Sequence, residues 1–253
     1  MSIQACAELV ERGDPDRFLA AMSAPPESRA ALFVLYAFNL EVVRAPWVTK
    51  EAMIAEMRLQ WWADAIDEIY KGGAVRRHEV VTPLAVLIAE NALERAAFDR
   101  LIEARRWDIY QEPHKDQAAF DQYILDTSSG LMWLAAQALG ADEAHRNAVM
   151  DYGFGAGVGA LFRAIPALEN AQKYPLVDGT PDGVTALATR ALKRLAVDAV
   201  PKPARPALRS GWMARQVLKQ AAKSPDLVAS GHLGTSEFYK KISLLWLSIT
   251  GGY

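Results

Sequence analysis

Apolar side chains recur at helical spacing along most of the chain, and the alternating apolar–polar pattern of β-strands is nearly absent. This spacing predicts an all-α protein, in which breakers such as Pro25-Pro26 and Gly72-Gly73 separate the helices. The linker-like stretch 173–183 is short enough to be a loop between two helices, so we expect one domain over residues 1–253. Helices are predicted at about residues 4–12, 15–22, 27–44, 49–71, 79–90, 94–111, 116–139, 142–170, 183–198, 204–223 and 236–249.

Two of these helices differ from an ordinary amphipathic helix. Residues 30–43 are apolar on nearly every side, which is typical of a helix surrounded by others. The segment 151–170 carries glycine at 153, 155, 157 and 159, and a glycine inside a helix costs about 1 kcal/mol relative to alanine. Glycines four residues apart, such as Gly153 and Gly157, make room either for a neighbouring backbone or for the flat body of an apolar ligand. The sequence leaves both interpretations open.

Three acidic side chains cluster within one turn of the predicted helix 49–71. Asp64, Asp67 and Glu68 are spaced so that they could share a divalent cation. On a helical wheel, however, they lie opposite the apolar stripe that contains Trp62. A charged face opposite an apolar one is typical of a solvated helix surface, so the metal site and the solvated face are both retained as interpretations.

The C-terminal part is basic, although the whole chain carries a net charge of −2. Between Lys193 and Lys241 there are ten Lys or Arg and three Asp or Glu, which gives a local charge of +7. The helix predicted at 236–249 either closes the core or lies on an anionic membrane. Its apolar stripe consists of Phe238, Ile242, Leu245, Trp246 and Ile249.

Composition excludes several classes of protein. The 253 residues are 51% hydrophobic and 23% charged, which fits neither a disordered chain nor a strongly basic nucleic-acid-binding protein. The single cysteine, Cys6, excludes an intramolecular disulfide and a cysteine-cluster metal site. The longest apolar run, residues 30–38, is too short for a membrane-spanning helix, and the N-terminus lacks the apolar region of a secretory signal. We therefore expect a cytoplasmic protein.

Several short blocks, taken in order, resemble successive blocks of the squalene/phytoene synthase family over about residues 10–220. The resemblance implies an all-α, isoprenoid-synthase-like helical bundle around a central cavity. The blocks are Phe18-Leu-Ala, residues 29–38, Leu59-Gln-Trp-Trp62 with Ile69-Tyr-Lys-Gly72, residues 98–109 and residues 153–163.

The same resemblance reveals a difference at the motifs that carry the family's chemistry. Members condense two prenyl diphosphates head to head, and two aspartate-rich motifs hold the diphosphates through Mg²⁺, because a hard cation needs several carboxylate oxygens. Aligned on these blocks, the chain has no aspartate at the expected places, which implies that both motifs are lost. The positions concerned are Val43, Arg44 and Trp47 for the first motif and Ala164, Ala167 and Leu168 for the second.

The function implied by the resemblance is that of a non-catalytic helper. Tyr36-Ala-Phe-Asn39 and Gln60-Trp-Trp62 are similar to the branch that includes the mitochondrial assembly factor of respiratory complex I. This branch implies an assembly or binding factor with a respiratory-complex partner, peripheral at the inner face of the inner membrane. Because an Arg-rich presequence is absent, we expect a bacterial member.

Two other functions remain as alternatives. The first is an active prenyl-diphosphate transferase that uses Asp64, Asp67 or Glu68 with Mg²⁺. The second is a carrier of an isoprenoid or another lipid. We expect no metal or cofactor outside the transferase alternative, and no nucleic-acid partner.

The candidate ligand residues come from the two unusual helices and from a family pattern. We predict an enclosed apolar pocket between these helices, with Arg163 at its mouth. The family's Glu-x-x-Arg-x-Asp pattern matches Glu103, Arg106 and Asp108, of which the first two either pair on a helix surface or join a buried polar network. The predicted cavity residues are Phe38, Asn39, Gly153, Gly157, Phe162, Arg163, Glu103, Arg106 and Asp108.

Overall fold

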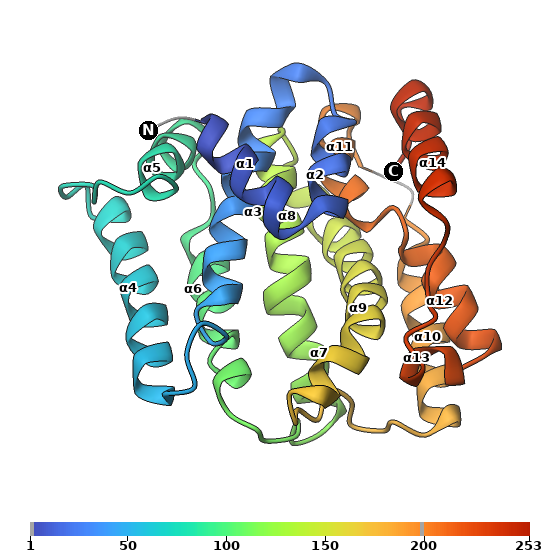
Figure 1. Cartoon of the computed structure of the whole chain (residues 1–253). Helices are drawn as coiled ribbons and strands as arrows, with labels where there is room; N and C mark the ends of the chain where they lie inside the picture. Colours follow the sequence, from blue (N-terminus) through green and yellow to red (C-terminus); the bar gives the residue numbers. More distant parts are fainter. Residues whose placement is uncertain (1–2, 198–199) are drawn as a thin grey trace.

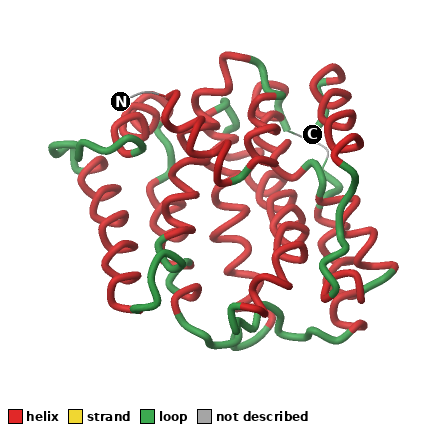
Figure 2. Tube along the Cα trace, in the orientation of Figure 1, coloured by secondary structure: helices red, strands yellow, loops and turns green. Residues whose placement is uncertain are grey.

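The computed structural model describes residues 3–197 and 200–253, and every regular element in these ranges is helical (Figures 1 and 2). The predicted all-α class is therefore confirmed. The predicted end of helix 183–198 includes residue 198, which lies outside the described residues. The α-helices are α1 (Ile3–Gly13), α2 (Pro15–Met22), α3 (Pro26–Arg44), α4 (Ala52–Tyr70), α5 (Val81–Asn91), α6 (Arg95–Ala104), α7 (Gln117–Ile124), α8 (Gly130–Ala138), α9 (Arg146–Asn170), α10 (Pro181–Arg194), α11 (Arg205–Leu208), α12 (Ala214–Lys223), α13 (Asp226–Ala229) and α14 (Glu237–Thr250).

Helices α3, α8 and α9 lie in the middle of the bundle, with α4 at one edge and α14 near the opposite edge (Figure 1). Every residue from Leu32 to Leu40 in α3 is buried, as the all-round apolar pattern predicted. In α8, every residue from Gly130 to Ala136 is buried as well. The remaining helices pack around these central helices.

The glycines of α9 allow unusually close helix packing. A Cβ atom added at Gly153 would lie 2.6 Å from Cα of Ser129, and one added at Gly155 would lie 2.6 Å from Cδ2 of Leu195. At Gly157 the added Cβ would lie 2.6 Å from Cβ of Ser128. These distances are shorter than van der Waals contact, so the glycines make room for neighbouring helices. A larger side chain at 157 would press on Ser128 rather than fill an empty space.

A π-helical turn over Leu125–Ser129 joins α7 to α8 and faces α9. It replaces the middle of the uninterrupted helix predicted at 116–139. Its wider winding places the backbone of Ser129 against Gly153, and the Ser129 hydroxyl donates to the carbonyl oxygen of Met150 over 2.8 Å. Such turns are frequent at functional sites.

Two other predicted helices are shorter than their sequence patterns indicate, and a buried cation makes backbone contacts at each break. The helix predicted at 94–111 ends at Ala104, and Nζ of Lys173 donates to the carbonyl oxygens of Asp108 and Tyr110. The helix predicted at 204–223 is broken into short turns before α12. Within that break, the buried Arg209 donates to backbone carbonyls near the C-terminus, those of Leu247 and Gly252.

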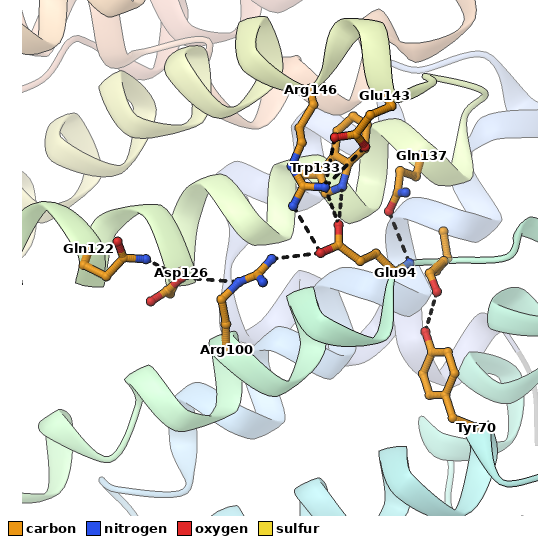
Figure 3. Close-up of polar contacts among 10 residues, drawn as sticks. Tyr70, Glu94, Arg100, Gln122, Asp126, Trp133, Gln137, Glu143 and Arg146 are labelled. Atoms are coloured by element: carbon orange, nitrogen blue, oxygen red, sulfur yellow. Dashed lines mark hydrogen bonds and ion pairs between the residues drawn. The ribbon is translucent and has the colours of Figure 1, made fainter.

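A polar cluster around Glu94 ties the start of α6 to α8 and α9 (Figure 3). The Glu94 carboxylate accepts from Arg100, from Arg146 and from the indole Nε1 of Trp133, each at about 3 Å. Burial alone would raise the pKa of Glu94, but these donors outweigh it and hold the pKa below its ordinary value. The cluster therefore fastens three helices with one ionised carboxylate.

Candidate functional site

A cavity of about 440 Å³ lies among α3, α7, the π-helical turn and α9. This volume falls within the range of small-molecule sites. Its lining contains both apolar and polar side chains, and these two sets of residues are called the apolar wall and the polar wall. The apolar wall includes Leu40, Val43, Leu131, Leu161, Ala164 and Leu168. The polar wall includes Asp14, Arg17, Asn39, Arg105, Asp108 and His114.

Asp108, Arg105 and Tyr123 form a buried network at the polar wall. Nη1 of Arg105 donates to Oδ2 of Asp108 over 3.0 Å and to the Tyr123 hydroxyl over 2.7 Å. The Tyr123 hydroxyl donates to Oδ1 of Asp108 over 2.9 Å. Burial is the largest influence on the Tyr123 phenol and raises its pKa. This group therefore stays protonated and keeps donating its hydrogen bond.

Next to this network, His114 stacks on Trp107 with ring centroids 4.0 Å apart and planes 8° apart. The His114 side chain is buried, and this burial lowers its pKa to about 4, although the nearby Asp108 acts in the opposite direction. The imidazole is therefore neutral at pH 7. Also in the polar wall, Nη1 of Arg17 donates to Oδ2 of Asp14 over 2.8 Å.

The structure brings only some of the predicted ligand residues to the cavity. Asn39, Asp108 and Gly157 line it, and the others do not. Phe38 is fully buried, with its ring centroid 5.5 Å from that of Trp62 and 5.3 Å from that of Phe98. Gly153 lies on the cavity side of α9, but Ser129 occupies the space beside it.

The predicted positions of Phe162 and Arg163 need correction. At 100° per residue, both side chains point well away from the direction of Gly157 and Ala164 on α9, so neither reaches the cavity wall. Phe162 is fully buried elsewhere in the core. Arg163 is not among the lining residues, and its Nη2 donates to Oδ2 of Asp16 over 2.9 Å.

Glu103 and Arg106 pair with each other at the surface. Nε of Arg106 donates to Oε2 of Glu103 over 2.8 Å, and the Glu103 side chain is 71% exposed. Arg106 also pairs with Glu56 and donates to Gln60, which connects the end of α6 to α4. The structure therefore supports the surface pair for Glu103 and Arg106, which lie outside the cavity. The neighbouring Arg105 instead joins Asp108 in the buried network.

The three acids of α4 are each engaged by polar or cationic partners on the outer face of the bundle. Asp67 pairs with Lys71 and Arg95, and these contacts hold its pKa below the ordinary value. Glu68 pairs with Arg76, and Asp64 accepts from Gln60 over 2.8 Å. Across residues 3–197 and 200–253, no three or more His, Cys, Asp and Glu side chains are grouped to hold a metal ion.

Most of the six positions at which the family's aspartate-rich motifs are expected lie at the cavity. Four of the six line its wall, and none of them is acidic. Arg44 lies close by, since its Nη2 would be 2.8 Å from a Cβ atom added at the lining residue Gly13. The four lining positions are Val43, Trp47, Ala164 and Leu168.

Helix α14 presents its apolar stripe to solvent. Its contacts with the protein include Leu244, its one buried residue, Lys240, which is 13% exposed and pairs with Asp16 and Glu237, and the carbonyl oxygen of Leu247, which accepts from Arg209. The stripe is largely exposed and does not close the core, although Ile242 and Trp246 also line a groove against Tyr152 and Trp212. Its exposed fractions are 75% for Phe238, 48% for Ile242, 60% for Leu245, 67% for Trp246 and 73% for Ile249.

No helix in the described ranges is both long and apolar enough to cross a bilayer.

Known proteins with similar sequences carry the name of a complex I assembly factor. The bovine NADH dehydrogenase (ubiquinone) complex I, assembly factor 6, is 26% identical over 162 residues, which cover 64% of this chain and 48% of the relative. The Drosophila melanogaster homolog of the same factor is 29% identical over 178 residues, 68% of this chain and 53% of the relative. The chain thus spans about half the length of the curated relatives it matches.

The fold is that of the isoprenoid synthases, as predicted. A dehydrosqualene synthase crystallised with a ligand superposes with a TM-score of 0.78 at 13% identity, covering 98% of this chain and 95% of that one. The sequence profile of squalene/phytoene synthases matches residues 10–176, about two thirds of the chain. Together with the helical bundle and its central cavity, this match shows that the chain belongs to the squalene/phytoene synthase family.

Proposed function

We propose that this protein is a non-catalytic assembly factor for respiratory complex I, built on the scaffold of a prenyl synthase. The names of its relatives support this function. The observation that carries it is the cavity wall, where Asp14 and Asp108 are the carboxylates among the described lining residues. Each is already paired with an arginine, Asp14 with Arg17 and Asp108 with Arg105. Two engaged carboxylates do not make the clustered oxygen site that Mg²⁺-bound diphosphates require.

The proposal is tested by deleting the gene in the source organism and by assaying the purified protein. We expect the deletion to reduce the amount of assembled complex I on native gels, and the full chain to restore it. Purified protein with Mg²⁺ and farnesyl diphosphate should release no diphosphate above a protein-free control. Unchanged complex I would contradict the assembly function, and diphosphate release that disappears in an Asp64→Asn variant would support the transferase alternative.

We also propose that the factor works at the inner face of the inner membrane and touches an anionic bilayer through α14. The apolar stripe of α14 consists of large exposed side chains. One of them, Trp246, is an aromatic residue of the kind enriched at membrane interfaces. The exposed Lys241 flanks the stripe, and a basic residue near an anionic surface adds about 1 kcal/mol of attraction. Lys240 is excluded from this role, because its ammonium is held by Asp16 and Glu237.

Liposome flotation tests this membrane contact. Ile249→Asp should reduce recovery with anionic vesicles at least about fivefold, because a carboxylate in the stripe would have to be desolvated and repelled by the lipid. Recovery of the unmodified chain should also fall as salt is raised. Met53→Asp is the matched control, since Met53 is 76% exposed on α4, far from the stripe. Equal recovery of both variants, or no binding by the unmodified chain, would contradict the proposal.

A further inference from the structure

A groove of about 620 Å³, separate from the central cavity, is lined by residues of α9, α12 and α14 and by the segments next to them. This volume falls within the range of small-molecule sites. Many of its described lining residues are aromatic, one is an arginine, and none is acidic. The aromatic residues are Tyr152, Trp212, Tyr239, Trp246 and Tyr253, and the arginine is Arg215. Tyrosine and tryptophan combine an apolar ring with a polar edge, which suits the interface between water and lipid.

The groove lies beside the apolar stripe of α14. At 100° per residue, the groove residues Tyr239 and Ser243 fall between the buried Leu244 and the stripe on the circumference of the helix. Ile242 and Trp246 belong to both the groove and the stripe. A ligand in the groove would therefore lie at the surface that the stripe presents to a membrane.

Tyr152 brings an unpartnered hydroxyl to this groove. The residue is 5% exposed, and its hydroxyl has no hydrogen-bond partner within residues 3–197 and 200–253. Because this oxygen is nevertheless not among the unpartnered polar atoms sealed from solvent, it opens into the groove that Tyr152 lines. Burial raises the pKa of the phenol above its ordinary value, although the charge of Arg215 acts in the opposite direction, so the hydroxyl is protonated and can donate.

Arg215 supplies a positive charge in the same place. Its Nη2 donates to the carbonyl oxygen of Leu195 over 3.1 Å, and no carboxylate in the described ranges pairs with it. It belongs to the stretch between Lys193 and Lys241, whose local charge of +7 attracts anions. A guanidinium with free N–H groups matches the oxygens of a phosphate. The groove therefore offers a phosphate two neighbouring donors, one of them charged.

From this arrangement we infer that the groove binds one phospholipid of net negative charge from the bilayer surface. Arg215 and Tyr152 hold its phosphate, and an acyl chain lies along Trp246 and Leu247. The lipid is anionic because none of the described lining residues is a carboxylate that could receive the ammonium of a zwitterionic head. This inference rests on the proposed membrane contact of α14 and names the lipid that this contact selects.

Isothermal titration calorimetry tests the groove without a bilayer, with dihexanoyl-phosphatidylglycerol below its micelle concentration as the probe. We expect one lipid to bind per chain, at least about fivefold more tightly than dihexanoyl-phosphatidylcholine, because only the anionic head gains from the basic surroundings. Glycerol 3-phosphate, which carries the anion without the acyl chains, should bind at least about tenfold more weakly. No binding of phosphatidylglycerol, or equally tight binding of either comparison compound, would overturn the inference.

Variants locate the phosphate. Tyr152→Phe removes only the hydroxyl and should weaken binding of dihexanoyl-phosphatidylglycerol about fivefold, whereas Arg215→Gln should weaken it about tenfold. Arg77→Gln is the matched control, since Arg77 is exposed in the loop between α4 and α5, and α4 lies at the edge opposite α14 (Figure 1). Thermal unfolding of each variant checks that it is folded. Equal weakening in Arg77→Gln and Arg215→Gln would contradict this assignment of the phosphate.

Two further variants separate the groove from the stripe. Ser243→Phe places a ring in the groove and should weaken binding of the soluble lipid at least about tenfold, while flotation with anionic vesicles persists through the stripe. Ile249→Asp should reduce flotation and leave binding of the soluble lipid unchanged, because Ile249 is not among the lining residues. Unchanged lipid binding in Ser243→Phe would overturn the groove and leave the membrane contact standing. Lipid binding by an unmodified chain that does not float would support the groove and contradict the membrane contact alone.

Discussion

Replacing Asp108 by alanine is expected to lower the free energy of unfolding by about 3–5 kcal/mol, the cost of removing one partner from a buried ion pair. The Asp108 side chain is 5% exposed, and the Arg105 side chain is 16% exposed. Without Asp108, the Arg105 guanidinium would keep its charge but lose its carboxylate, and the Tyr123 hydroxyl would lose its acceptor. Urea denaturation followed by circular dichroism measures the loss.

The control for this experiment is Glu103→Ala, five residues earlier in the same sequence pattern. Glu103 pairs with Arg106 at the surface and is 71% exposed, so its removal should cost less than about 1 kcal/mol. If both variants lost the same stability, Asp108 would not be the anion that holds the buried network together.

The sequence predicts the central architecture well, because burial leaves a periodic trace. The all-round apolar pattern of 30–43 correctly placed α3 in the middle of the bundle. The alternating glycines of α9 left both close packing and a ligand groove open, and only the distances from Gly153 to Ser129 and from Gly155 to Leu195 decide for packing at those two positions. Helical periodicity reports which side of a helix is apolar, but not which neighbour covers it.

The same limitation explains α14. Its apolar stripe was correctly identified, but the pattern is identical for a helix that closes the core and one that faces outward. The contacts of α14 with the rest of the protein set its orientation. Leu244 is buried, and Lys240 pairs with Asp16, which lies near the N-terminal end of the chain.

The polar wall of the cavity was mostly missed, because its residues are far apart in sequence and follow no repeat. Arg17 comes from α2, Arg105 from the end of α6, His114 from a loop and Tyr123 from α7. Asp108 was found through the family pattern, and that pattern drew attention to Arg106 instead of its neighbour Arg105. The helix ends at Ala104, and this break in the predicted helix 94–111 decides which of the two arginines turns inward.

Acidification should destabilise the protein between about pH 7 and pH 4.5, and His114 is the residue expected to cause it. The pKa of its imidazole falls from an ordinary 6.5 to about 4 on folding, so between these values the unfolded chain binds a proton that the folded chain does not. Stability from the neutral imidazole is therefore present above pH 6.5 and lost as the pH falls, by about 2 kcal/mol at pH 4.5.

A His114→Phe variant isolates this contribution, because phenylalanine can stack on Trp107 but carries no titrating group. Glu94 also favours the folded state at neutral pH, but its pKa is held below an ordinary 4.5, so its contribution is lost only at lower pH. Urea denaturation at pH 7 and at pH 4.5 should thus show a drop in unfolding free energy for the unmodified chain and a clearly smaller drop for His114→Phe. An equal drop in both would mean that the acid sensitivity comes from carboxylates and that the imidazole is solvated well enough to charge in the folded state.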